Sequence, residues 1–299
     1  MQKIILLFLF ILVSFTWGTT WLAMKIVLET IPPIFATGLR FLLTSPLLIL
    51  IALFTKKDLF FPEGKRFFQF IISVFYFAVP FTLMLYGGHY LNSGISSIIF
   101  ANMPVFVLVL SSYILKKKFY LLQNIGSLIS ISSLVYLLIE NIYNLNFLKI
   151  KGILALVSAM IIHALVYTQC KKQLLNVSVI TFNALPSFFS GIILIIISFF
   201  VENPKINDFS LISFTAVIYL SIFAGIFGIL SYFYLQKNVS LFHASIVFLI
   251  FPFISIGLES YFYSYNISNQ ELMIMMFTLL GILLTLIPKQ YFKKINCLN

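Results

Sequence analysis

The chain has 299 residues, of which 61% are hydrophobic and 9% are charged, and its formal net charge is +11. A soluble domain carries about 25% charged residues, so this composition excludes a water-soluble globule and predicts an all-α polytopic membrane protein. Transmembrane β-strands are also excluded. They would be about ten residues long and would alternate apolar with polar residues, whereas the apolar runs here are continuous.

Ten apolar runs are long enough to cross a hydrocarbon core about 30 Å thick as helices. In chain order they cover residues 4–24, 32–54, 67–88, 93–115, 121–139, 150–170, 178–200, 211–236, 240–262 and 271–288. The first run lacks a small-x-small cleavage site, so we expect an uncleaved first helix. The connections are too short for a soluble domain, which predicts one membrane unit.

The basic residues predict which side of the membrane each connection occupies. With both termini in the cytoplasm, fourteen of the nineteen basic residues lie on the cytoplasmic side and four lie outside. The fourteen are Lys3, Lys56, Lys57, Lys65, Arg66, Lys116, Lys117, Lys118, Lys171, Lys172, Lys237, Lys289, Lys293 and Lys294, and the four are Lys25, Lys149, Lys151 and Lys205. This bias follows the positive-inside rule and needs an anionic lipid surface as partner, not nucleic acid. We therefore expect a multi-pass protein of the inner (plasma) membrane.

The reactive side chains argue against an enzyme or a metal site. Cys170 and Cys297 both fall near the predicted cytoplasmic side, where the reducing compartment disfavours a disulfide. No CxxC motif and no cluster of cysteine with histidine occurs in the sequence, so we expect neither a metal nor another cofactor. All eight acidic residues lie at or near predicted helix ends, which gives no deep carboxylate pair for catalysis or for a proton relay.

The second half of the chain repeats features of the first half. Residues 93–113 align with residues 241–261 at a shift of 148. This register pairs Pro104 with Pro252, each near the middle of a predicted span. A proline there removes a helix hydrogen bond and frees a carbonyl at mid-membrane. Such breaks are tolerated where they line a cavity, although a packing kink is an equal alternative.

A second register supports the repeat. At a shift of 146, residues 17–25 lie over residues 163–171. We therefore expect two units, residues 1–148 and 149–299, with five spans each. Because five is odd, the second unit would enter the membrane from the opposite side, which predicts an inverted repeat. Inverted repeats are typical of secondary transporters, in which a site between the halves opens to each side in turn.

The beginning of the chain carries a recognisable pattern of residues. Trp17 and Gly18 are followed by Lys25, then by Pro33 at the start of the second span, and Arg40 stands seven residues after that proline. This pattern resembles the opening of EamA-type members of the drug/metabolite transporter superfamily. The span at 93–115, with its small-residue entry and central proline, is similar to the fourth helix of that family.

The resemblance implies a fold and a function. It covers the whole chain and implies ten helices in two five-helix halves, with transport of amino acids, metabolites or drugs. The sequence departs from the family pattern in three places: "KKKFY" replaces a Gly-Glu pair after the fourth helix, His163 stands where Trp is usual, and "YSYNISNQE" is a long polar turn.

We expect repeat-related polar and aromatic side chains to line a central cavity between the halves. The cavity candidates are Trp17, Trp21, Tyr86, Asn102, His163, Tyr167 and Glu259. The structural or gating candidates are Gly18, Arg40, Pro104 and Pro252. His163 could instead pack in the protein or carry a proton. Glu259 could be a coupling or substrate-amine site, or simply an interfacial carboxylate.

Arg40 needs its own explanation, because an arginine deep in an apolar helix costs about 2.5–3.5 kcal/mol on insertion scales. The favoured hypothesis is structural, with the guanidinium bridging carbonyl groups at a neighbouring helix end. The alternatives are direct contact with the substrate and snorkelling to a lipid headgroup.

The sequence thus predicts a secondary transporter for a small organic metabolite, working in the lipid bilayer by alternating access. Export of amino acids or related compounds is the leading hypothesis, and an importer or exchanger of the same fold is the alternative. Two other classes remain: a membrane enzyme, which lacks a deep cluster of catalytic groups, and a structural membrane protein without transport, which has no use for an inverted repeat.

Overall fold

The structure is a computed structural model of the protein, and it describes residues 2–114, 116, 119–143, 147–173 and 177–288. Ten spans within these residues are long and apolar enough to cross a membrane, and none of the described residues forms a strand. The predicted all-α polytopic class is therefore confirmed. Several residues used to predict the topology lie outside the described part of the chain, namely Lys117, Lys118, Lys289, Lys293, Lys294 and Cys297.

Six of the ten spans are single helices and four are divided into shorter segments. In the first half the segments are α1 (Gln2–Val27), α2 (Pro33–Phe54), α3 (Arg66–Ile72), η1 (Ser73–Ala78), α4 (Val79–Tyr90), α5 (Ser93–Ala101), α6 (Met103–Ile114) and α7 (Leu121–Tyr143). In the second half they are α8 (Phe147–Gln173), α9 (Val179–Val201), η2 (Ile206–Asp208), α10 (Leu211–Tyr219), η3 (Leu220–Gly228), α11 (Ile229–Asn238), α12 (Leu241–Ser245), α13 (Val247–Tyr263) and α14 (Asn269–Leu286). The divided spans are α3–η1–α4, α5–α6, α10–η3–α11 and α12–α13.

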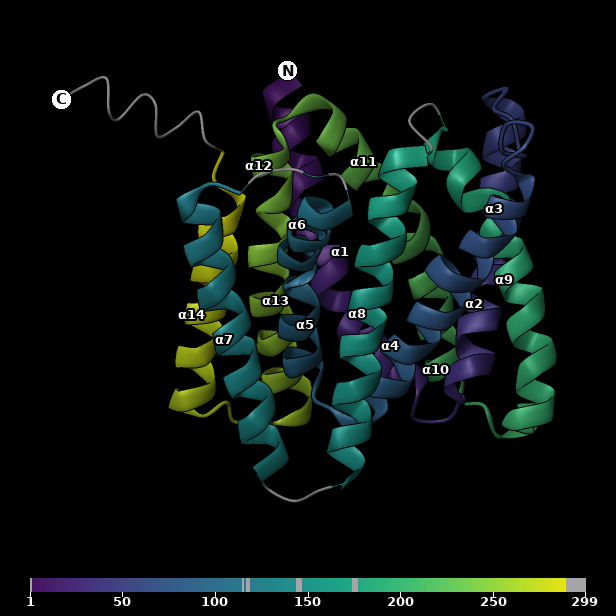
Figure 1. The fold of residues 1–299 in the computed structure, drawn as a ribbon. Helices are drawn as coiled ribbons and strands as arrows, with labels where there is room; N and C mark the ends of the chain where they lie inside the picture. The colour runs from purple at the N-terminus through teal and green to yellow at the C-terminus, as the bar shows by residue number, and fades with distance from the viewer. Residues whose placement is uncertain (1, 115, 117–118, 144–146, 174–176, 289–299) are drawn as a thin grey trace.

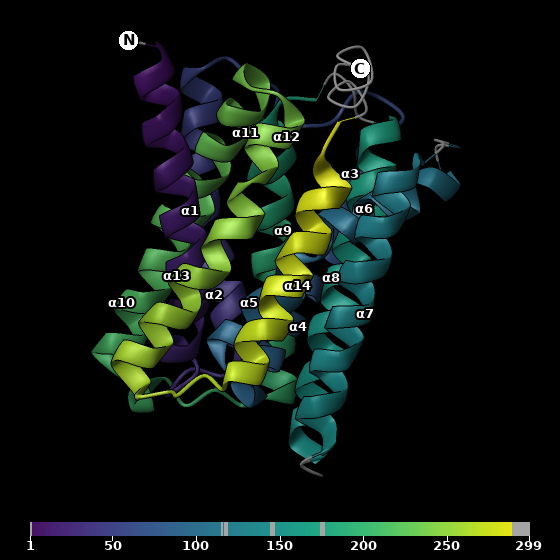
Figure 2. The same cartoon turned by 90° about the vertical axis from the view of Figure 1, so that its left-hand side faces the viewer.

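The helices form one bundle with two distinct ends (Figure 1). We call the end where α1 begins and α14 ends the terminal end, and the opposite end the distal end. The first helix of the second half, α8, runs in the direction opposite to α1. Helices α7 and α14 lie side by side along one edge of the bundle (Figure 2), and α2 pairs with α9 at the other edge.

Small residues let the paired helices approach closely, as is usual where lipid supplies no hydrophobic drive for association. Between α7 and α14, a Cβ atom added to Gly126 would lie 2.6 Å from the backbone nitrogen of Thr285. A Cβ atom added to Gly281 would collide with the backbone of Ser130. Gly18 has a similar role, because its added Cβ would lie 2.6 Å from the Cβ of Ile254 on α13. Gly18, a structural or gating candidate, thus lies where α1 and α13 approach closely.

The segments η1 and η3 are π-helical, and each receives a hydrogen bond from the other half of the chain. The hydroxyl of Ser190 on α9 donates to the carbonyl of Ser73 in η1. The hydroxyl of Thr44 on α2 donates to the carbonyl of Ser221 in η3, at 3.1 Å. These donors satisfy carbonyl groups where the helical ladder is widened, which a hydrocarbon environment requires. In the third span, Pro80 also lacks the N–H that a regular α-helix would use.

A carboxylate caps the N-terminus of α2 at the distal end. Glu202, which follows α9, accepts hydrogen bonds from the backbone N–H groups of Ile34 and Phe35 at 2.8 and 2.9 Å, and so caps α2. Burial raises the pKa of Glu202, and the two backbone donors oppose that shift. A carboxylate is favourable there because the N–H groups of a first helical turn have no partner within the helix.

The glycine contact between α7 and α14 gives a stability prediction. Gly281→Ala should lower the melting temperature of the purified protein in detergent, because overpacking costs about 1–3 kcal/mol. Gly257→Ala is the matched control, since Gly257 lies within α13 with no atom within 4 Å of its added Cβ. The control should be neutral or slightly stabilising, because Ala favours a helix over Gly by about 1 kcal/mol. Equal melting temperatures for the two variants would contradict the close contact.

Candidate functional site

A cavity of about 270 Å³ lies between the two halves of the chain. The first half contributes lining residues from α1, α2 and the third and fourth spans, and the second half contributes them from α8, α9, α14 and the eighth and ninth spans. The size is just below the range of about 300–1,000 Å³ that is usual for small-molecule sites. The cavity is therefore suited to a small metabolite rather than to a macromolecule.

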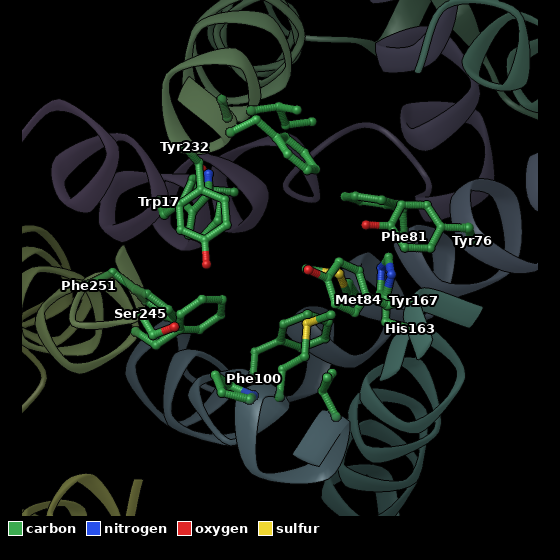
Figure 3. Close-up of a pocket in the computed structure, with 18 of the residues that line it drawn as sticks. Trp17, Tyr76, Phe81, Met84, Phe100, His163, Tyr167, Tyr232, Ser245 and Phe251 are labelled. Atoms are coloured by element: carbon green, nitrogen blue, oxygen red, sulfur yellow. The ribbon is translucent and has the colours of Figure 1, made fainter. Parts of the chain in front are cut away.

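Aromatic side chains form most of the wall (Figure 3). Trp17 and Tyr232 lie together on one side, with ring centroids 4.6 Å apart. Tyr76, Phe81 and His163 lie on the opposite side. The apolar wall leaves few polar groups to orient a bound molecule, and this is the usual design of a ligand pocket.

His163 lies within the aromatic wall and is almost fully buried, with 4% of its surface exposed. Its imidazole meets the rings of Tyr76, Phe81 and Phe100 at centroid distances of 4.8, 5.1 and 5.8 Å, each nearly perpendicular. No described residue forms a hydrogen bond with its Nδ1 atom. His163 therefore both packs against neighbouring rings and lines the cavity.

The cavity extends from the middle of the bundle toward the terminal end. Gln236 in the last turn of α11, Ser245 at the end of α12 and Leu286 at the end of α14 all contribute to its wall. Gln236 lies near the hydroxyl groups of both Tyr167 and Tyr232. Polar side chains, those of Gln236 and Ser245, thus line the part of the wall that lies toward the terminal end.

The structure brings together most, but not all, of the predicted cavity residues. Trp17, Trp21, His163 and Tyr167 line the cavity, and so do two residues predicted to have structural or gating roles, Arg40 and Pro104. Tyr86, Asn102, Glu259, Gly18 and Pro252 lie outside the lining. Tyr86 packs instead against the ring of Tyr90, with centroids 5.1 Å apart.

Sequence reasoning missed several lining residues, among them Tyr76, Tyr232, Asn183 and Gln236. One signal was present: the register of 148 that aligns the prolines also pairs Phe100 with Phe248, and both rings line the cavity. Nothing comparable marks Asn183 or Gln236, because single amides near helix ends are common.

Asn102 lies at the break between α5 and α6 rather than in the cavity. Its side-chain amide donates to the carbonyl of Ile98 at 3.0 Å, and its amide oxygen accepts a hydrogen bond from the hydroxyl of Ser130. Pro104, two residues after Asn102, has no N–H to continue the helix. Asn102 therefore satisfies the interrupted backbone, which explains why a fully buried amide occurs there.

Glu259 lies near the distal end of α13 and binds groups of the first half of the chain. Its carboxylate is fully buried, and its Oε1 atom lies 2.7 Å from the Nζ atom of Lys25. Its Oε2 atom accepts hydrogen bonds from the hydroxyl of Ser93 at 2.9 Å and from the backbone N–H of Gly94 at 2.8 Å. This distal seal, composed of Lys25, Ser93, Gly94 and Glu259, joins α1 and the first turn of α5 to α13 in the other half.

Arg40 is 5% exposed and stands in the wall of the cavity on α2. Among the described residues, no atom accepts a hydrogen bond from its Nε or Nη1 atom. Its guanidinium makes a cation–π contact with the ring of Phe81, whose centroid lies 5.0 Å from the guanidinium carbon. The carbonyl acceptors that a purely structural role would require are therefore not in place at these two nitrogens.

The described residues contain no group of three His, Cys, Asp or Glu side chains that could hold a metal ion. The cavity wall also has no acidic residue among those described. The arrangement can bind a small molecule by aromatic contacts and by the few polar groups, of which Arg40 alone carries a fixed charge.

Comparison with known proteins gives consistent results. The model of the EamA-like transporter family matches residues 4–139 and 150–287. A protein of Buchnera aphidicola subsp. Schizaphis graminum, named an uncharacterized transporter, is 59% identical over 295 residues, which cover 99% of this chain and 98% of that protein. The protein PagO of Salmonella typhimurium is 51% identical over 289 residues, covering 97% of this chain and 95% of its own length.

More distant likenesses agree with these. The uncharacterized inner membrane transporter YedA of Escherichia coli K12 is 28% identical over 225 residues, covering 75% of this chain and 72% of its own length. A crystal structure of a protein with 13% sequence identity superposes with a TM-score of 0.68 and covers 96% of this chain and 97% of that chain. That likeness concerns the fold alone.

The distal seal gives a prediction for a double-mutant cycle. Glu259→Gln should destabilise the purified protein by about 3 kcal/mol or less, because it leaves the Lys25 ammonium without a counter-charge while Lys25 still reaches some water. Adding Lys25→Met should recover part of the loss, with a coupling of at least about 0.5 kcal/mol. Glu63→Gln in an exposed loop is the control and should be neutral. Strictly additive melting temperatures would show that the pair is not coupled.

Proposed function

Because the chain belongs to the EamA-like transporter family, we propose that it is a secondary transporter that moves small organic metabolites by alternating access. The observation that carries this proposal is the cavity between the halves, which has a mostly aromatic wall and contributions from both halves. A multi-pass protein of this family is a membrane transporter and not an enzyme. We propose in addition that the substrate passes through the cavity between the halves.

The two ends of the cavity support the idea of alternating access. The distal end is closed by the seal around Glu259, and the wall reaches toward the terminal end through Gln236 and Ser245. We take this conformation to be the one that receives substrate from the terminal end. The opposite conformation requires Glu259 to release Lys25 and the first turn of α5. Such a change of a few polar contacts between rigid elements is the usual form of gating.

The two-unit organisation, residues 1–148 and 149–299, is part of the same proposal. The family model matches two stretches of similar length, and α8 runs opposite to α1. The crossed hydrogen bonds at η1 and η3 add support, because Ser73 and Ser221 are related by the register of 148 and Thr44 and Ser190 by that of 146. Repeat-related residues thus make equivalent contacts to the other half, as an inverted repeat would produce.

We place the protein in the inner (plasma) membrane with both termini in the cytoplasm, on the strength of the basic-residue bias. The cavity would then face the cytoplasm, which suits export of amino acids or related compounds. Import or exchange by the same fold is the second candidate. Its support is that alternating access is reversible, so the driving gradients decide the direction of transport.

Transport can be tested with a variant that fills the cavity. Ile229→Trp adds bulk to a lining residue and should abolish solute flux in proteoliposomes without loss of folded yield. Leu280→Trp is the matched control, because Leu280 is 45% exposed on the outer surface of α14, and it should transport normally. The solute is first chosen by a thermal-shift screen against a metabolite library. Equal flux through both variants, or no solute moved above empty liposomes, would contradict the proposal.

The orientation can be tested by labelling intact cells in a background in which Cys170 and Cys297 are replaced by Ser. Asn266→Cys in the distal connection between α13 and α14 should react with a membrane-impermeant maleimide from outside. Lys57→Cys, after α2 at the terminal end, should react only after permeabilisation. The reverse pattern would show that the termini are external.

A further inference from the structure

Arg40 places a positive charge without a counter-charge in the wall of the cavity. Only 5% of the surface of Arg40 is exposed, and two of its nitrogen atoms, Nε and Nη1, have no acceptor among the described residues. A buried cation without a partner is strongly unfavourable, and proteins normally pair such groups. The chain does so elsewhere, since Lys25 at the distal end has Glu259 at 2.7 Å.

The surroundings of Arg40 do not neutralise it. The rings of Phe81 and Phe41 lie 5.0 and 6.0 Å from the guanidinium carbon, and a cation–π contact contributes about 0.5–2 kcal/mol, less than the cost of dehydrating a full charge. Asn183 shares the cavity wall with Arg40, but its amide is neutral, and its oxygen accepts no hydrogen bond from Nε or Nη1 of Arg40. No acidic side chain stands in the described wall.

A small adjoining space also fails to supply a counter-charge. A second cavity of about 20 Å³ touches Arg40, Thr44 and Asn183. This volume is enough for one water molecule. A water molecule can accept a hydrogen bond from the guanidinium, but it carries no net charge. The charge of Arg40 therefore remains without a counter-charge among the described residues, and Arg40 borders the larger cavity as well as the small one.

The chemistry of the guanidinium indicates which ligand group would pair with it. Its planar fork matches a carboxylate, which can accept two parallel charge-assisted hydrogen bonds. The rest of the wall is aromatic and apolar, so the body of the molecule would be apolar. An ammonium group, as in an amino acid, would find no carboxylate among the described wall residues, because Glu259 lies outside the lining and is already paired.

We propose that Arg40 binds the carboxylate of the substrate, and that the substrate is a small organic anion with an apolar or aromatic body and no positive charge. This inference rests on the proposed transport function, because it assigns the cargo of the same cavity. It narrows the leading hypothesis from amino acids to related carboxylates that lack the amino group.

The two tryptophans of the chain provide a direct readout. The sequence contains two Trp residues, and both Trp17 and Trp21 line the cavity. Intrinsic fluorescence therefore reports occupancy of this cavity in the purified full-length protein. We would titrate three probes of nearly equal shape: 3-phenylpropionate, its neutral amide, and phenylalanine, which adds an ammonium group. The charge comparison would be repeated with acetate against acetamide and with butyrate against butyramide.

The carboxylates should bind at least about tenfold more tightly than their amides, and 3-phenylpropionate more tightly than phenylalanine. Arg40→Gln should remove this preference while leaving the melting temperature unchanged or higher, because it removes a buried unpaired charge. Arg40→Lys should keep the preference with weaker affinity, since a point charge replaces the fork. Arg66→Gln at the exposed start of α3 is the control and should bind as the unmodified protein does.

Several results would overturn the inference: no carboxylate preference across the whole panel, an unchanged preference in Arg40→Gln, or equal binding of carboxylate and amide by Arg40→Lys. A sharply lower melting temperature for Arg40→Gln would favour the structural role instead. If Arg40→Gln does not fold, Arg40→Lys decides the question by its charge preference alone. Carboxylate-selective binding without flux in proteoliposomes would contradict the transport proposal and leave this inference standing. Solute flux without a preference for carboxylates would contradict this inference and leave the transport proposal standing.

Discussion

The structure depends on one constraint: within hydrocarbon, each backbone polar group and each charge must find its partner inside the protein. The long helices satisfy most groups by themselves, and the interruptions are satisfied by particular side chains. Asn102 does this at the break between α5 and α6, and Thr44 and Ser190 do it at the π-helical segments η3 and η1. These interrupted spans are also among those that surround the cavity. The irregular backbone therefore occurs where the bundle is hollow, and the cost of each irregularity is met by a hydroxyl or an amide.

The same constraint distinguishes charged residues whose partners lie within the protein from those that lack a partner there. Glu202 and Glu259 are each bonded to the first turn of a helix from the other half, so their roles are complete without a ligand. Arg40 differs, because two of its donors have no acceptor and no acid faces it from the described wall. Because Arg40 carries a full charge, and burying an unpaired charge costs far more than burying an unpaired hydroxyl, this cation in the wall of the central cavity is best understood through what binds there.

The sequence was sufficient for the ten spans, because a continuous apolar run about 20 residues long has few structural alternatives. The repeat or the family pattern placed Trp17, Trp21, His163 and Tyr167 near the centre, and all four line the cavity. Asn102 and Glu259, which were also cavity candidates, lie outside the lining and form hydrogen bonds with backbone groups. A polar residue in an apolar run signals that a partner is required, but whether the protein supplies the partner depends on tertiary contacts that span up to 234 residues. The π-helical segments could not be predicted for the same reason, since their hydrogen bonds come from the other half.

The geometry around Glu259 has a consequence for how the distal end can open. One carboxylate serves an ammonium, a hydroxyl and a backbone N–H group, on α1 and α5. Moving α13 away from α1 and α5 would weaken all of these bonds together, because the three donors share one carboxylate. In the proposed transport cycle, opening of the distal end would therefore be cooperative, with a barrier between two discrete arrangements rather than a graded series. For the proposed transporter, a closure of this kind would leak little while shut, so a gradient across the membrane would be maintained between turnovers.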